Sequence, residues 1–239
     1  MKNYFLKAAA VLGLVTPLLS HAVPMVITDV SDLDFSGNFV YAVNFNGSGT
    51  QTIGDASFTN MNAIGAGNTS GIGISGYNRN LVWGGASDLG SSADNNSLEN
   101  VMSSIIWSDG LNPGNFDLNV NAGTDYRLQL LFSEGWDSDR HFDVNVEGAL
   151  LDEVLGTKVG GAVWQKSPTQ GYAMSLDFTA TDSILDIDLL RNAPGDTNYH
   201  ISGLTLELVS VPEPTTLSLL GLGLAGLGFA RRQKNLNII

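Results

Sequence analysis

The chain has 239 residues, no cysteine and a formal net charge of −13. The lack of cysteine excludes disulfides, thiol catalysis and Cys-ligated zinc. The acidic balance argues against a nucleic-acid partner, since phosphate contacts need clustered Lys and Arg.

The first 22 residues have the pattern of a secretory signal peptide. Lys2 and Lys7 form a short basic region, residues 8–19 are apolar, and Ser20-His21-Ala22 supplies small residues for a signal peptidase. We therefore expect cleavage after Ala22. The alternative is a buried N-terminal helix, which does not account for this order of charge, apolar core and small residues.

Residues 23–210 form the expected domain, and 188 residues suit one domain with a two-sheet core. Five of the 11 basic residues and one of the 24 acidic residues lie outside this range. Six basic residues therefore face 23 acidic ones, a net charge near −17. Carboxylates at this density keep a secreted protein soluble, and some can bind sugar hydroxyls or calcium.

Alternating apolar and polar residues predict β-strands along this domain. A polar turn at Asn121-Ala122-Gly123-Thr124 separates two of them. Residues 47–110 are rich in Gly, Ser and Asn, and residues 95–106 have some helical character. This organisation predicts an all-β fold, an antiparallel sandwich or jelly roll. The alternating segments are residues 39–45, 116–120, 126–132, 142–146, 172–178, 183–190 and 201–209.

Residues 211–239 form a separate tail. Pro212 and Pro214 bracket Glu213 and prevent a regular helix or inner strand there. Residues 215–230 carry no charge, and we expect a transmembrane segment there, slightly shorter than the usual span of about 20 residues. Arg231 and Arg232 follow and should stay in the cytoplasm. A buried core helix is the weaker alternative, because such a helix is rarely apolar on all faces.

Val-Pro-Glu-Pro, a Gly/Leu-rich span and a terminal Arg cluster resemble the PEP-CTERM tail of bacterial envelope proteins. The resemblance covers residues 211–234 and implies recognition of Pro212-Glu213-Pro214 by an exosortase. It also implies a Gram-negative host that makes exopolysaccharide. The expected protein is secreted, transiently anchored in the inner membrane, and then placed at the cell surface or outside the cell.

A second resemblance lies in YRLQLLFSEGWDSDRHFDVNVEG, residues 126–148, which is similar to the central hairpin of malectin-like domains. The segments DSILDIDL, NYHISGLTLEL and YAVNFNGSG are similar to other strands of that family. The resemblance implies a galactose-binding-like jelly roll. It also implies a sugar site at the loop ends, because the founding member binds a glucose disaccharide there with aromatic residues and an Asp.

Carried over by position, Trp136 occupies the aromatic loop, and Asp137 stands where a second aromatic residue is expected. Asp196 lies one residue out of step with the family's Asp. Leu89 replaces a sugar-binding Tyr in the stretch Ala-Ser-Asp-Leu-Gly, which puts the founding member's own ligand in doubt. Trp107 and Tyr199 are the candidates to replace the missing rings.

The chemistry of Trp136 supports the same site independently. An exposed indole covers the apolar face of a sugar, and neighbouring carboxylates such as Glu134 accept hydrogen bonds from its hydroxyls. The alternative is that Trp136 folds back as a lid over the end of the sandwich.

Other candidates have fewer matching residues. Asp137-Ser138-Asp139 could contribute to a structural calcium site, but two acids do not supply six to eight oxygens. Glu134 could pair with Asp143 or Asp196 for glycoside hydrolysis, although acids are so common here that pairs arise by chance. Asp186 and Asp188 fit a solvated strand face, and His141 and His200 lack a neighbouring nucleophile. We expect no cofactor and no metal.

The sequence therefore predicts a secreted, non-catalytic protein that binds a glycan or exopolysaccharide. Two other functions stay open: a surface-coat or matrix protein without sugar binding, and a glycoside hydrolase.

Overall fold

The computed structural model describes residues 23–62, 71–110, 112–136, 140–155, 158–159, 162–163, 168–192 and 198–209. The predicted signal peptide and the sorting tail with its transmembrane segment lie outside these residues. No helix within the described ranges is both long and apolar enough to cross a membrane. The described residues up to Leu208 belong to one compact unit, and the chain from Val209 onward is assigned to a second unit.

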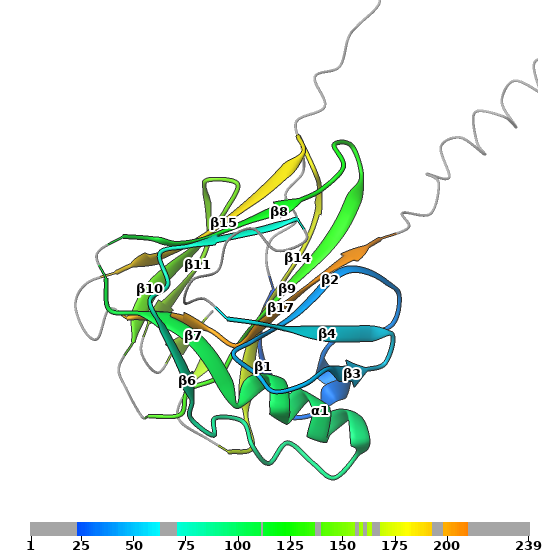
Figure 1. Ribbon diagram of the computed structural model, residues 1–239, viewed down its shortest axis with the longest axis vertical. Coiled ribbons are helices and arrows are strands. Elements are labelled where there is room, and N and C mark those ends of the chain that lie inside the picture. The colour runs from blue at the N-terminus through cyan, green and yellow to red at the C-terminus, as the bar shows by residue number, and fades with distance from the viewer. Residues whose placement is uncertain are drawn as a thin grey trace, which may run out of the picture. The chain divides into compact units, whose positions relative to one another are not determined.

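Strands dominate the first unit (Figure 1). The elements in its first half are β1 (Val23–Ile27), the 3-10 helix η1 (Val30–Asp32), β2 (Asn38–Phe45), β3 (Gln51–Ile53), β4 (Ala56–Met61), β5 (Ile72–Ser75), β6 (Arg79–Val82), α1 (Ala93–Met102) and β7 (Ser104–Ser108). Those in its second half are β8 (Gly114–Asn119), β9 (Asp125–Phe132), β10 (His141–Val146), β11 (Ala149–Leu155), β12 (Lys158–Val159), β13 (Ala162–Val163), β14 (Gly171–Thr179), β15 (Ile184–Arg191), β16 (Tyr199–Ile201) and β17 (Gly203–Leu208).

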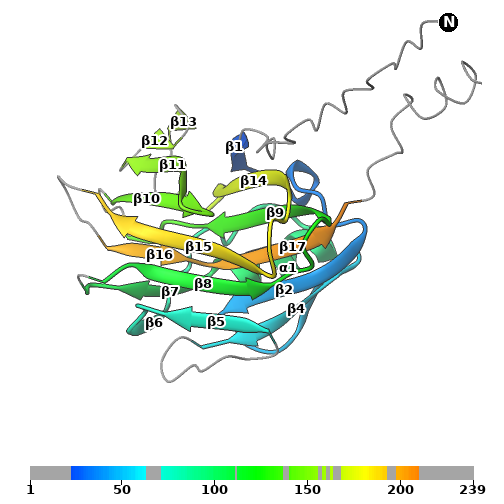
Figure 2. The same cartoon turned by 90° about the horizontal axis from the view of Figure 1, so that it is seen from above.

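Two large sheets form the sandwich (Figure 2). The first has the order β1-β14-β9-β17-β2-β4-β3 and the second the order β13-β12-β11-β10-β15-β8-β5. A small third sheet, β16-β7-β6, lies beside them. The predicted all-β sandwich is therefore confirmed, with one parallel pair, β2 with β4, among the described strands that are otherwise antiparallel.

The main core lies between the two large sheets. The alternating faces found in the sequence supply it: residues 126–132 contribute Tyr126, Leu128, Leu130 and Phe132, all buried. Burial of such side chains is the main favourable term in folding, at about 25 cal/mol per Å² of apolar surface. In β15 of the second sheet, the outward-facing side chain of Asp186 is exposed, as expected for a solvated position.

Two connections lead from one sheet to the other and do not join adjacent strands of the same sheet. The turn at residues 121–124 does not join neighbouring strands, because β8 belongs to the second sheet and β9 to the first. The same is true of β9 and β10, so residues 126–148 form an arch between the sheets and not a hairpin. Alternation shows which residues of a strand face the core, but it does not show to which of the two sheets the strand belongs.

A second apolar cluster covers the outer face of the first sheet. Helix α1 packs Leu98, Val101 and Met102 there, against Phe58 of β4 and Leu131 of β9. The predicted helical character of residues 95–106 is thus confirmed for its first part, whereas β7 begins at Ser104.

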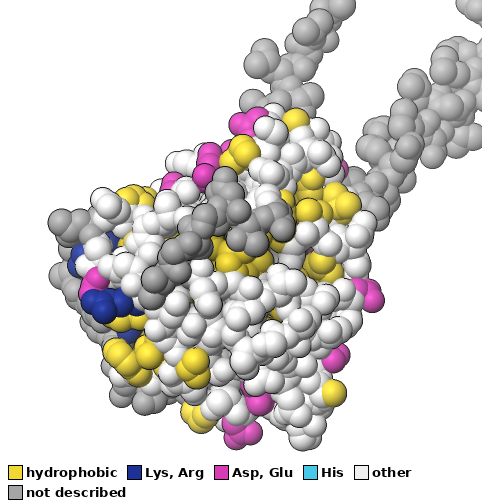
Figure 3. Space-filling model, viewed as in Figure 1, with side chains coloured by type: hydrophobic (Ala, Val, Ile, Leu, Met, Phe, Trp, Pro, Cys, Tyr) yellow, Lys and Arg dark blue, Asp and Glu magenta, His cyan; other side chains and the backbone are white. Residues whose placement is uncertain are grey.

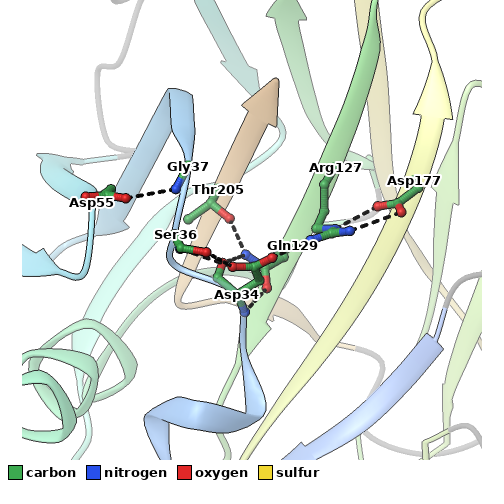
Figure 4. A network of polar contacts seen from close by, with 8 residues as sticks. All are labelled: Asp34, Ser36, Gly37, Asp55, Arg127, Gln129, Asp177 and Thr205. Carbon is green, nitrogen blue, oxygen red and sulfur yellow. Dashed lines mark hydrogen bonds and ion pairs between the residues drawn. The ribbon is translucent and has the colours of Figure 1, made fainter. Parts of the chain in front are cut away.

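Beside that cluster, a polar network holds the segment after η1 to the sheet (Figure 4). The amide of Gln129 donates to the carbonyl of Asp34 at 2.7 Å and to the hydroxyl of Thr205 at 3.0 Å. Arg127 forms ion pairs with Asp34 at 2.5 Å and with Asp177 at 2.8 Å. The outer face of the first sheet therefore carries an apolar cluster and, beside it, a polar network that binds the segment after η1.

Candidate functional site: an aromatic strip beside the third sheet

The loop that follows β9 is held by a buried carboxylate. One oxygen of Glu134 accepts a hydrogen bond from the backbone N–H of Trp136 at 2.7 Å. The other accepts from Nε of Arg140 at 2.9 Å, and both side chains of this ion pair are at least 96% buried. A buried, fully bonded ion pair fixes geometry strongly. These contacts fix the backbone N–H of Trp136, which is 54% exposed, to the buried ion pair.

Trp136 lies against a second indole, Trp83, which directly follows β6. The two ring centroids are 6.3 Å apart, with planes inclined by 59°. The Trp83 ring nitrogen donates to the hydroxyl of Ser133 at 3.1 Å, and the guanidinium of Arg140 lies 5.4 Å from the Trp83 ring centre. A side chain at Gly135 would come within 2.6 Å of the Trp83 ring, so only glycine permits this approach.

His200 of β16 forms the floor beneath Trp83. Its ring is fully buried and lies 5.0 Å from the Trp83 ring in an edge-to-face arrangement. Burial and the nearby charge of Arg140 lower the pKa of His200 well below its usual value, so the ring is neutral. Nε2 lies 3.0 Å from the carbonyl oxygen of Ser133 and therefore carries the proton it donates.

Trp107 continues the row on the neighbouring strand. It is the register partner of His200 in β7, and directly opposite residues of antiparallel strands share one sheet face. The guanidinium of Arg79 lies 5.9 Å from the Trp107 ring centre and pairs with Asp109 at 3.3 Å. Trp136, Trp83 and His200 are thus joined by ring contacts, and Trp107 lies opposite His200 on the same sheet face; we call these four residues the aromatic strip.

The strip is rich in tryptophan and is partly open to solvent. Three of the chain's four tryptophans belong to it, and at least Trp136 is open to solvent. On the face shown in Figure 3, Lys and Arg side chains gather at one side together with hydrophobic side chains, whereas acidic side chains are spread around the rim. Within the described part of the chain, no three His, Asp or Glu side chains gather to hold a metal ion.

The structure brings some of the predicted site residues together and separates others. Trp136 and Trp107 lie in the strip, as Glu134 lies beneath it. Glu134 uses both oxygens within the protein, which differs from its expected role as a sugar-binding or hydrolytic carboxylate.

Tyr199 lies in the core and not at the surface. It is fully buried, and its hydroxyl lies 2.7 Å from the carbonyl oxygens of both Gly76 and Asn112. It is therefore not available to a ligand as the missing ring. Asp137 and Asp196 lie outside the described residues, as do Ser138 and Asp139 of the possible calcium site.

Trp83 was missed by sequence reasoning, although a signal exists. It stands in Trp83-Gly84-Gly85, immediately before the stretch in which Leu89 replaces the family's Tyr. Leu89 itself is buried in the second apolar cluster.

Comparison with protein families gives a match at the end of the chain. Residues 210–233 match the model of the PEP-CTERM protein-sorting motif. The chain carries a PEP-CTERM sorting signal. The motif marks an exosortase-sorted protein that is exported, anchored in the membrane and placed at the surface or outside the cell. This match confirms the predicted PEP-CTERM motif, and no curated protein matches the chain.

Among solved structures, the PEP-CTERM chain is similar to plant ectodomains. The ANX1 ectodomain from Arabidopsis thaliana is 13% identical, with a TM-score of 0.49 over 74% of this chain and 52% of that one. The plant receptor-like kinase ANX2 is 11% identical, with a TM-score of 0.49 over 78% and 54%. These ectodomains are malectin-like, and this chain spans about half of their length. A calcium-binding mutant of Bacteroides uniformis beta-glucuronidase 2 is 11% identical, with a TM-score of 0.46 over 79% and 18%.

Proposed function

We propose that this extracellular protein binds carbohydrate without catalysis and uses the aromatic strip to do so. The observation that carries the proposal is the exposed Trp136 indole, seated against Trp83 on a loop that the buried Glu134–Arg140 pair holds in place. A sugar has an apolar C–H face and a rim of hydroxyls, and indoles at a polar surface match both features. The exopolysaccharide of the producing cell is the expected ligand.

The state of Glu134 supports a binding function over hydrolysis. A glycosidase needs two carboxylates that flank the scissile bond, one of which must gain and lose a proton. Glu134 is 4% exposed, and both of its carboxylate oxygens are bonded within the protein, which keeps the group away from substrate. The role of this carboxylate is to position the loop.

Affinity electrophoresis in gels that contain the exopolysaccharide tests the proposal. Trp136→Ala should lose about tenfold or more in affinity, as expected for one stacking ring. Leu150→Ala is the matched control, since Leu150 is a 55% exposed apolar side chain in β11, outside the strip. Equal mobility of Trp136→Ala and the wild type would refute the strip as the sugar site.

The rival function, a surface-coat protein, makes a different prediction. Its acidic surface would associate through cations, so sedimentation would show calcium-dependent self-association, with no retardation by any glycan. That pair of results would replace the carbohydrate-binding proposal.

A further inference from the structure

A pocket lies in the first sheet where β2 and β4 separate. These strands run parallel, but their register pairs only Val43–Phe45 with Thr59–Met61. The earlier halves of the two strands diverge and enclose a pocket of about 550 Å³. At its far end the backbone N–H of Gly37 donates to Asp55 at 3.0 Å, as Figure 4 shows. The backbone N–H of Asp55 in turn donates to the carbonyl of Phe35 at 2.8 Å.

The two walls of this pocket differ in chemistry. Strand β4 supplies the exposed polar side chains of Ser57, Thr59 and Asn60. Strand β2 supplies Val40, which is 39% exposed, and the aromatic side chain of Tyr41. The pocket volume falls within the range of about 300–1,000 Å³ that is usual for small-ligand sites. A ligand that fits must therefore present hydroxyls on one side and C–H groups on the other.

Charge narrows the ligand class further. Asp55 is the charged residue among the described lining residues, and its Oδ2 already accepts the Gly37 N–H. An anionic ligand would meet this carboxylate and no basic side chain among the described lining residues, so it would lose its hydration without gaining an opposite charge. The polar wall and the apolar wall match a neutral polyhydroxylated ring better than an anion.

We propose that the β2–β4 pocket is a second binding site, which holds one neutral sugar unit. It shares no residue and no strand with the aromatic strip, which is built from β6, β7, β16 and the loop after β9. A chain with two separate sugar sites connects two glycan strands without needing a second copy of itself.

Saturation-transfer NMR in a Trp136→Ala background tests this site apart from the strip. The probes are glucose, galactose, mannose and N-acetylglucosamine, each added alone. At least one should receive saturation in Trp136→Ala. Adding Ser57→Ala and Thr59→Val should weaken that signal about fivefold or more, as loss of a hydrogen bond implies.

Thr52→Val is the matched control, because Thr52 is an exposed strand threonine on β3 that does not line the pocket. It should leave the signal unchanged, and near-UV circular dichroism should show that all variants stay folded. No transfer to any probe in Trp136→Ala, or full transfer after Ser57→Ala and Thr59→Val, would overturn the pocket as a sugar site. Neither result depends on whether the strip binds glycan.

Discussion

The backbone N–H of Trp136 donates to the carboxylate of Glu134 at 2.7 Å, two residues earlier in the same loop. This short contact links an exposed aromatic side chain to an ion pair in the interior, since Arg140 occupies the other oxygen of Glu134. The position of the Trp136 ring thus depends on the carboxylate of Glu134, which is buried and does not face a ligand.

Glu134→Gln should destabilise the protein more than its small change in shape suggests. The amide keeps an oxygen for the Trp136 N–H, but the buried guanidinium of Arg140 would then face a neutral group. We expect a loss of about 3 kcal/mol in the free energy of unfolding, measured by denaturant titration. Asp109→Asn, which neutralises the exposed pair with Arg79, is the control and should change little. Similar small losses in both variants would show that the Glu134–Arg140 pair is not structurally important.

Trp83→Phe tests the contribution of the aromatic ring apart from that of its hydrogen bond. The variant keeps an aromatic face beside Trp136 but loses the bond from the indole nitrogen to Ser133. We expect a stability loss of about 1 kcal/mol and weaker glycan binding, because Trp136 then packs on a smaller and less fixed neighbour. Isothermal titration and thermal unfolding measure the two effects. Binding equal to the wild type would mean that Trp136 acts alone.

Two carboxylates should respond to pH with opposite signs: Asp34 of the polar network, and Glu207 of β17, the register partner of Arg127. Burial, with the charge of Asp34 next, raises the pKa of Glu207, so its stabilising contribution exists at low pH and is lost as pH rises through the folded-state pKa. The hydrogen bond from Ser36 is the largest cause that lowers the pKa of Asp34, whose contribution exists at neutral pH and is lost on acidification.

Glu207→Gln should therefore stabilise the protein at pH 7 relative to pH 4, whereas Asp34→Asn should destabilise it at pH 7. Urea titrations of both variants and the wild type at the two pH values give the comparison. If both variants shift stability in the same direction at pH 7, the opposed pKa directions of these two carboxylates are wrong.

The sorting motif should determine where the protein ends up. Glu213→Ala alters the centre of Pro212-Glu213-Pro214 and should leave uncut protein in the inner-membrane fraction. Fractionation and mass spectrometry of the C-terminus measure the outcome. Unchanged release of a shortened protein would mean that cleavage does not depend on this residue.

The sequence indicated much of the sandwich, because alternation along residues 39–45, 126–132 and 142–146 reflects one buried face per strand. It did not indicate which sheet each strand joins. That choice depends on the lengths and directions of the loops, as the arch between β9 and β10 shows. The second apolar cluster was missed because its members come from many separate elements, including β1, β3, β4 and α1.

The candidate site was predicted only where one side chain carried its own signal. Trp136 stood out as an aromatic residue among charged ones, and it is exposed. Tyr199 looked equally suitable but is buried, since aromatic residues in strands give the same pattern in the core and at the surface. Trp83 and the partnership of Glu134 with Arg140 depend on contacts between segments far apart in the chain or across a loop.

The position of β17 affects how a tethered molecule bears load. This last strand lies inside the first sheet, with β2 on one side and β9 on the other, and it ends at Leu208. A cut near residues 212–214 would thus remove no residue of the sheet. Before such a cut, tension on the C-terminus would act along β17 and shear two hydrogen-bonded ladders at once, so a stretched anchor would meet high mechanical resistance.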